Sequence, residues 1–166
     1  TLEEFGGSEY LSFVNEKKGT NYESEVVPTV DASSNIKLYK AFNKAVDKEI
    51  VASAISVGRG GAGIALAKSS LAGLLGAQVS LSEASQYTKN DSAILFSESQ
   101  GRILTSINPK NKKEFEQLFK GRFALLGTVV REPSIKIKKI DDKSISLNLD
   151  EMMTAYKKTF KRRSGV

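Results

Sequence analysis

The chain has 166 residues, of which 40% are hydrophobic and 27% charged, and it contains no Cys, His or Trp. This length and composition predict one folded domain over residues 1–166. The absence of Cys and His excludes a disulfide framework, zinc sites of the usual ligand set and nucleophiles activated by an imidazole, and it leaves carboxylate metal sites and lysine-based mechanisms open.

No apolar stretch approaches the roughly 20 residues that cross a bilayer, and residues 1–4 lack the basic start of a signal peptide. Together with the absence of Cys, this predicts a cytoplasmic protein without a membrane segment. Because the first residue is Thr rather than Met, we expect a fragment of a longer chain.

The net charge of +6 is concentrated near the C-terminus. Residues 131–166 carry ten Lys or Arg and five Asp or Glu, so they contribute +5. Such a tail could contact nucleic acid, but cations at a helix end are more often solvated and interact favourably with the helix dipole. Nucleic acid is therefore not the favoured partner of the tail residues Lys157, Lys158, Lys161, Arg162 and Arg163.

Capping signals and apolar spacing predict the elements of the first half. In residues 1–30, Thr1-x-x-Glu4 and Ser8 each predict a short helical turn, and the polar residues 15–25 predict a loop. After Asp31, apolar residues at intervals of three and four predict a helix of about four turns. Residues 51–57 predict a buried strand, and the Ala- and Leu-rich residues 62–75 predict a helix that Gly76 ends.

Alternating and turn-forming residues predict the second half. Strands are expected at residues 77–81, 93–96, 102–107, 123–130, 135–137 and 145–149, with residues 82–91 as a loop or short helix. Residues 97–101 are expected to form the turn of a hairpin-like pair. Asn108 and Pro109 begin a helix that ends at Gly121, and a basic terminal helix covers residues 150–166.

The strongest candidate site is the turn Gly58-Arg59-Gly60-Gly61, which follows a strand and precedes a helix. Glycines let backbone N–H groups approach a ligand, the helix N-terminus favours negative charge, and the Arg59 guanidinium suits phosphate oxygens. The alternative is a turn that is merely tight, because short glycine patterns occur often without a ligand. The spacing matches neither a dinucleotide fingerprint nor a P-loop.

A second candidate is the segment Ser97-Glu98-Ser99-Gln100-Gly101-Arg102, which places a carboxylate, two hydroxyls and a guanidinium within six residues. It could bind a polar ligand or a metal-bound nucleotide. Ser and Gly are also ordinary turn residues, so a solvated hairpin turn explains the pattern equally well.

Taken in order, these motifs resemble the C-terminal AIR-synthase-related domain of phosphoribosylformylglycinamidine synthases. The family's Gly-Gly-Ser-Glu-Tyr is matched by residues 6–10, its Phe-Ser-Glu-Ser-x-Gly-Arg by residues 96–102, and its Leu-Gly-x-Val by residues 126–129. Its His-Asp-x-Ser-x-Gly-Gly-Leu-Ala-x-Ala-Leu-Ala aligns with residues 55–67, where Ile55 and Ser56 replace the His-Asp pair and Gly58 replaces the Ser.

The resemblance implies an α+β fold, in which helices flank a mixed sheet. It also implies a domain of the ATP-dependent ligase that converts formylglycinamide ribonucleotide to formylglycinamidine ribonucleotide with ammonia from glutamine. An N-terminal AIR-synthase-type domain of the same chain would hold most of the ATP and Mg²⁺, and a glutamine amidotransferase module would supply the ammonia. A homodimer is also possible.

By this comparison, one wall of the ligand cleft would be formed by Gly58, Arg59, Gly60, Gly61, Ser97, Glu98, Ser99 and Arg102. No catalytic residue and no metal ligand is expected in the chain itself. Because Ile55 and Ser56 lack the charge and hydrogen-bonding groups of a His-Asp pair, the alternative is a non-catalytic assembly domain of a degenerate paralogue.

Overall fold

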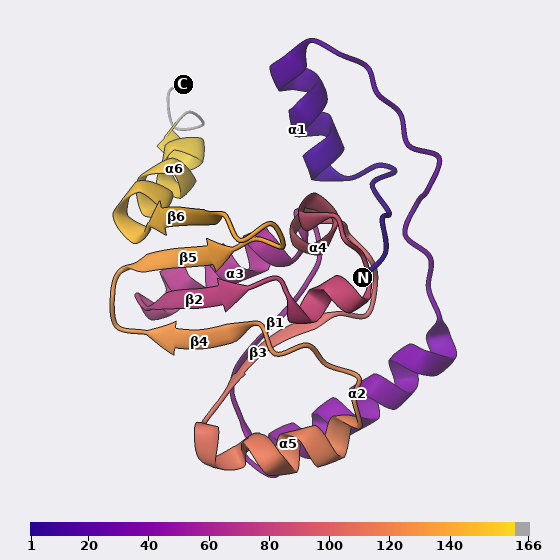
Figure 1. The fold of residues 1–166 in the computed structure, drawn as a ribbon, viewed down its shortest axis with the longest axis vertical. Coiled ribbons are helices and arrows are strands. Elements are labelled where there is room, and N and C mark those ends of the chain that lie inside the picture. Colours follow the sequence, from indigo (N-terminus) through magenta and orange to yellow (C-terminus); the bar gives the residue numbers. More distant parts are fainter. Residues whose placement is uncertain (162–166) are drawn as a thin grey trace.

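The computed structural model describes the backbone of residues 1–161 and the side chains of residues 1–158. Figure 1 shows a sheet backed by helices, with a long two-stranded ribbon that connects it to a separate pair of helices. The helices are α1 (Glu9–Lys18), α2 (Ala32–Asp47), α3 (Gly61–Gly73), α4 (Asp91–Phe96), α5 (Lys112–Phe119) and α6 (Leu149–Lys161), with short 3₁₀ turns at Glu83–Gln86 and Pro109–Asn111. The strands are β1 (Val51–Ser56), β2 (Gly76–Ser80), β3 (Ile103–Ile107), β4 (Gly127–Val130), β5 (Ser134–Lys138) and β6 (Ser144–Asn148).

The larger sheet has four strands in the order β4-β2-β5-β6 and is mixed. Strand β2 runs antiparallel to β4 and parallel to β5, and β5 runs antiparallel to β6. On β5 the buried Ile135 and Ile137 alternate with the exposed Lys136 and Lys138, because successive side chains of a strand point to opposite faces. Helices α3, α4 and α6 cover the apolar face and complete the main core. The α+β class and the mixed sheet flanked by helices are therefore confirmed.

Strands β1 and β3 form a separate antiparallel ribbon, with Ile55 opposite Leu104. The ribbon leads to a second core, in which Ala45 and Ile50 pack against Phe119 between α2 and α5. The strand expected at residues 51–57 is present as Val51–Ser56, but the expectation that it is buried is wrong. Ala52, Ser53 and Ala54 are exposed, because a two-stranded ribbon has few neighbours to cover its faces.

All but one of the predicted helical segments are present, although several boundaries differ. Asp31 caps α2 by accepting a hydrogen bond from the Ser34 N–H (3.0 Å), and Ser8 caps α1 through the Leu11 N–H (3.2 Å). The helical turn expected at residues 1–4 is absent. Helix α1 also continues through residues 15–18, which were expected to be a loop, and ends at Gly19 in the left-handed conformation.

The strand expected at residues 93–96 is wrong, because these residues belong to helix α4. Asn90 caps the helix by accepting hydrogen bonds from the N–H groups of Ser92 (3.0 Å) and Ala93 (3.3 Å). Ala93, Ile94 and Leu95 are all buried. A short run that is apolar on every side fits a buried helix as well as a buried strand, so its periodicity did not discriminate between them. The strand expected at residues 123–130 is likewise shorter and covers only Gly127–Val130.

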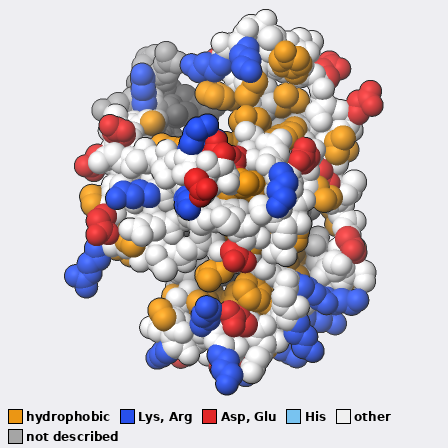
Figure 2. All heavy atoms as spheres, in the orientation of Figure 1, with side chains coloured by type: hydrophobic (Ala, Val, Ile, Leu, Met, Phe, Trp, Pro, Cys, Tyr) orange, Lys and Arg blue, Asp and Glu red, His pale blue; other side chains and the backbone are white. Residues whose placement is uncertain are grey.

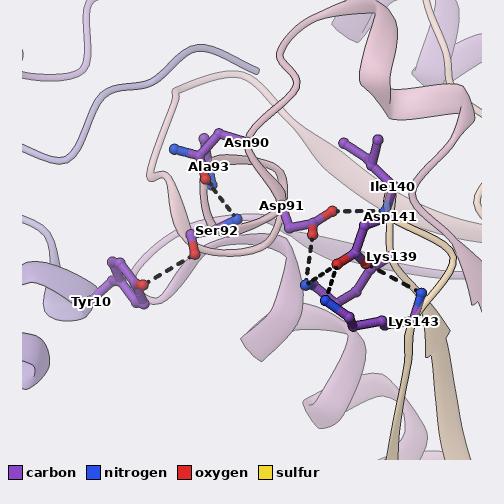
Figure 3. A network of polar contacts seen from close by, with 9 residues as sticks. All are labelled: Tyr10, Asn90, Asp91, Ser92, Ala93, Lys139, Ile140, Asp141 and Lys143. Carbon is purple, nitrogen blue, oxygen red and sulfur yellow. Dashed lines mark hydrogen bonds and ion pairs between the residues drawn. The ribbon is translucent and has the colours of Figure 1, made fainter.

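A polar network fixes α4 between α1 and the β5–β6 turn (Figure 3). Asp91 accepts a hydrogen bond from the Ile140 N–H (3.1 Å) and pairs with Lys139 (3.3 Å). The bond to Asp91, with further help from Asp141, raises the pKa of Lys139 above its usual value. On the other side, the Tyr10 hydroxyl donates to Ser92 Oγ (3.1 Å). The first turn of α4 is therefore held in place from both sides.

The predicted terminal helix is present as α6, where Lys157 and Lys158 are exposed. The side chain of Lys161, together with Arg162 and Arg163, lies outside the described residues. Among the helices of residues 1–161, none combines the length and the hydropathy needed to cross a bilayer.

The core predicts which isoleucines stabilise the sheet. Ile135 on β5 is only 1% exposed, whereas Ile145 on the neighbouring β6 is 39% exposed. We expect Ile135→Ala to lower the free energy of unfolding by about 3 kcal/mol, through lost burial and a new cavity. The matched Ile145→Ala should cost less than about 1 kcal/mol. Equilibrium urea unfolding of both variants tests this, and equal losses would contradict the core assignment.

Candidate functional site

The turn between β1 and α3 packs directly against the end of α4. Gly60 and Gly61 have φ angles of +82° and +71°, which side chains rarely adopt. A Cβ at Gly61 would lie 2.6 Å from the Leu95 carbonyl oxygen and 2.7 Å from that of Ser97. Glycine at this position therefore allows two backbones that are 34 residues apart in sequence to touch.

The Glu98 carboxylate joins this turn to helix α1. Its Oε1 accepts hydrogen bonds from the N–H of Gly60 (2.8 Å) and from the N–H of Glu9 (3.0 Å). The Gly61 N–H donates to the Gly58 carbonyl (2.9 Å). The amides of Gly60 and Gly61, which the sequence offered as ligand donors, thus already have partners within the chain.

A hollow of about 220 Å³ opens beside the turn. It is lined by Ile55, Ser56, Gly58, Arg59, Gly61, Ile64, Ala65 and Lys68. The Arg59 side chain is 84% exposed and forms an ion pair with Glu9. The hollow thus combines two cations and the Ser56 hydroxyl with an apolar floor. Since its lining contains no carboxylate, it suits an anionic group.

Lys68 is the residue of this hollow that the sequence analysis missed. It lies seven residues after Gly61 on α3, and a spacing of two helical turns puts both on one face. Its spacing from the glycine turn was the signal that could have identified it. Lys68 is exposed and takes part in no ion pair within the described residues.

The other predicted site residues lie beneath the N-terminal segment rather than in the hollow. Ser97 is fully buried and Ser99 is 5% exposed. Ser99 Oγ accepts a hydrogen bond from the Leu2 N–H (3.1 Å). The Arg102 guanidinium donates to the carbonyls of Ser97 and Ser99 and to Thr1 Oγ1 (3.1 Å). The interpretation as a solvated hairpin turn is therefore wrong.

Burial lowers the pKa of Arg102, while the nearby carboxylates of Glu4 and Glu98 act in the opposite direction. Glu4, which the sequence analysis did not single out as a functional residue, is 2% exposed. Its Oε1 accepts hydrogen bonds from the N–H (3.1 Å) and the hydroxyl (3.3 Å) of Thr29. Burial alone would raise the pKa of Glu4, but the Ser99 hydroxyl and the Thr29 donors outweigh it and hold this pKa below its usual value.

Aromatic packing completes the attachment of the N-terminal segment. The Tyr10 ring stacks on Phe96 with centroids 4.9 Å apart, and Phe5 contacts the same Tyr10 ring at 5.4 Å. The Gly6–Tyr10 motif thus anchors residues 1–30 to α4. In this position the segment covers the buried serines and leaves the hollow open.

The turn geometry predicts that two glycines of the same turn differ in how their substitution affects stability. Gly61→Ala should lower the free energy of unfolding by about 2–4 kcal/mol, through the strained φ and the clash with the end of α4. At Gly58 a Cβ meets nothing within 4 Å, so Gly58→Ala should be neutral or stabilise by up to about 1 kcal/mol. Thermal or urea unfolding of both variants gives the comparison, and a tolerated Gly61→Ala would refute the close approach.

The Glu4 site predicts a pH dependence. A carboxyl whose pKa is lower in the folded state stabilises the protein above its unfolded pKa, and the contribution disappears as the pH falls through the folded pKa. Glu4→Gln should therefore lower the Tm at pH 7 and reduce the further loss of Tm between about pH 5 and pH 3. The control Glu16→Gln, at an exposed position of α1, should follow the parent profile. If the loss of Tm between about pH 5 and pH 3 is unchanged in Glu4→Gln, then Glu4 is not its source.

Comparison with known proteins identifies relatives that share one name. Phosphoribosylformylglycinamidine synthase subunit PurL of Methanocaldococcus jannaschii is 32% identical over 165 residues, which is 99% of this chain and 22% of the relative. The subunit of the same name from Methanococcus aeolicus is 28% identical over 99% of this chain and 21% of its own length. The chain thus spans about a fifth of the relatives it matches.

Solved structures share the fold. T. maritima PurL complexed with FGAR superposes with a TM-score of 0.69 at 21% identity, over 81% of this chain and 23% of the other. E. coli HypE superposes with a TM-score of 0.59 at 17% identity, over 90% of this chain and 47% of the other. Residues 2–140 match the family described as AIR synthase related protein, C-terminal domain. With this match over most of its length, the chain belongs to the AIR synthase related proteins, as their C-terminal domain.

Proposed function

We propose that this chain is the C-terminal domain of an ATP-dependent ligase that converts formylglycinamide ribonucleotide to formylglycinamidine ribonucleotide in purine biosynthesis. The observation that carries the proposal is the hollow beside the β1–α3 turn, in a chain whose relatives are named as subunits of that synthase. Neighbouring structures are named as complexes of T. maritima PurL with FGAR and with ATP, which supports an anionic ligand.

In this proposal the predicted site residues have two kinds of role. Gly58, Arg59 and Gly61 line the hollow and contact a phosphate or substrate group, with Lys68 as a second cation. Gly60 and Glu98 set the shape of the turn through their hydrogen bond. Ser97, Ser99 and Arg102 position the loop from below, since their polar groups contact the N-terminal segment and the loop backbone.

The residues present do not fit a magnesium ion. Mg²⁺ prefers carboxylate oxygens and water, whereas the hollow is lined by two cations. Among the described residues no group of three or more acidic side chains is placed to hold a metal. We therefore assign any Mg²⁺, and most contacts to ATP, to an N-terminal AIR-synthase-type domain of a longer chain.

The remaining partners follow from the same proposal. A glutamine amidotransferase module would supply ammonia, a proposal supported by a neighbouring structure named PurLQS from Thermotoga maritima. The absence of Cys agrees with a cytoplasmic location. The alternative of a non-catalytic assembly domain rests on Ile55 and Ser56, and it is not favoured because the relatives are named as synthase subunits.

The proposal predicts that charge in the hollow determines ligand affinity. In the full-length protein that contains this sequence, Arg59→Ala and Lys68→Ala should each weaken binding of formylglycinamide ribonucleotide or ADP about five- to tenfold, through loss of a cation–phosphate contact. Isothermal titration calorimetry measures this. The control Arg131→Ala removes an exposed cation outside the hollow and should bind like the parent.

Two results would decide against the proposal. If the parent chain binds neither ligand, the assembly-domain alternative gains support. If the parent binds but both variants retain its affinity, then the ligand is recognised elsewhere and the hollow is not its site.

A further inference from the structure

A second and larger hollow lies between α2 and α5, beside the second core. Its volume is about 390 Å³, and it is lined by Lys37, Leu38, Lys40, Ala41, Lys44, Gln117, Leu118, Phe119, Lys120 and Arg122. Figure 1 shows α2 and α5 at the end of the molecule opposite α6, with the β1–β3 ribbon between them and the larger sheet. This α2–α5 groove shares no lining residue with the hollow beside the β1–α3 turn.

Five of the ten lining residues are cations, and none is Asp or Glu. In the part of the chain that the structure describes, no ion pair involves any of the five, whereas other lysines pair closely with acids, as Lys138 does with Asp142 (2.7 Å). The pKa of Asp31 is lowered chiefly by hydrogen bonds from Ser34, and the charge of Lys37 is the last of its causes. Lys and Arg side chains also gather over the α2 region at the lower right of Figure 2.

This arrangement works against the stability of the free protein. Lys37, Lys40 and Lys44 follow one another at intervals of three and four on α2, where like charges repel. Lys44 in the last turn of α2 and Lys120 at the C-terminal end of α5 benefit from the helix dipole, but Lys37 and Lys40 do not have that explanation. An anion bound among the five cations would offset the repulsion.

Size and lining indicate the class of anion. A volume of this size lies within the range of small-molecule sites, about 300–1,000 Å³. Lysine ammonium groups and the Arg122 fork are the usual partners of phosphate oxygens, and Leu38, Ala41 and Leu118 add apolar surface to the same lining. Cations that converge on one hollow match a compact, multiply charged group better than an acidic peptide, in which each side chain carries a single charge.

We propose that the α2–α5 groove binds a small molecule bearing two or more linked phosphates, held by Lys37, Lys40, Lys44, Lys120 and Arg122. The apolar side chains of the groove contact the remainder of that molecule. This site is separate from the hollow beside the β1–α3 turn and does not depend on the ligase proposal.

The test compares two double variants, each lacking a pair of lysines, in the full-length protein that contains this sequence. Lys40→Ala/Lys44→Ala removes two cations from the groove, and Lys110→Ala/Lys113→Ala removes two exposed cations outside its lining. Inorganic triphosphate and ATP are titrated at low salt by calorimetry. We expect the groove pair to weaken triphosphate binding at least about tenfold, and the control pair to stay within about twofold of the parent. Arg59→Ala should leave the groove-dependent binding intact, which separates this site from the ligase site.

Thermal unfolding supplies the second readout. Without ligand, the groove pair should keep or raise the Tm because it removes mutual repulsion, and it should lose the rise in Tm that triphosphate gives the parent. A preference for ATP over triphosphate that the parent shows and the groove pair loses would show that the apolar side chains of the groove are used. Equal groove-dependent binding of the two would show that the phosphates suffice.

Four outcomes would overturn the proposal. The first is no saturable triphosphate binding to the parent, and the second is unchanged binding in the groove pair. The third is an equal loss in the control pair, which would mean a diffuse effect of net charge. The fourth is binding of single-stranded RNA that depends on Lys40 and Lys44 while triphosphate binding does not, which would make the groove a nucleic-acid surface.

Discussion

The carboxylate of Glu98 connects three segments that are distant in sequence: the loop after α4, the glycine turn before α3, and the start of α1. One oxygen accepts hydrogen bonds from Gly60 and Glu9, and the contact at Gly61 brings the same turn onto the end of α4. If this junction were loosened, the N-terminal segment would lose its position over Ser97 and Ser99, and the hollow beside the turn would lose one wall. The shape of the candidate site therefore depends on an internal anion.

The same interaction changes how the glycine turn can recognise a ligand. A turn with free N–H groups would cup a phosphate through its backbone, but here Glu98 takes the Gly60 donor. What remains for an external anion is the side chains around the hollow, Arg59 and Lys68, together with Ser56. In the proposed function an anion is therefore bound by cationic side chains rather than by backbone donors, and the proposal for the α2–α5 groove uses the same chemistry at the other end of the ribbon.

Only the part of the predicted site that is close together in sequence lies in the hollow. Gly58, Arg59 and Gly61 are consecutive or nearly so, and they line one hollow as expected of a strand–turn–helix junction. Lys68 was missed although its helical spacing placed it on the same face. Ser97, Ser99 and Arg102 were grouped with the turn on the basis of motif order, yet Ser97 is buried, and the N-terminal residues Thr1 and Leu2 bond to Arg102 and Ser99. No local pattern indicates which distant segment will cover a loop.

The sequence by itself determined the class of fold, most helix and strand positions, the family and the absence of imidazole and thiol chemistry, because periodicity, capping residues and composition are local properties. Only the tertiary structure decided that residues 93–96 form a helix, because a short run buried on all sides has no exposed face to reveal its period. It also decided that the β1–β3 ribbon stands apart from the larger sheet, and that five cations from two separate segments meet in one groove. Such pairings depend on long-range packing, which composition and spacing do not encode.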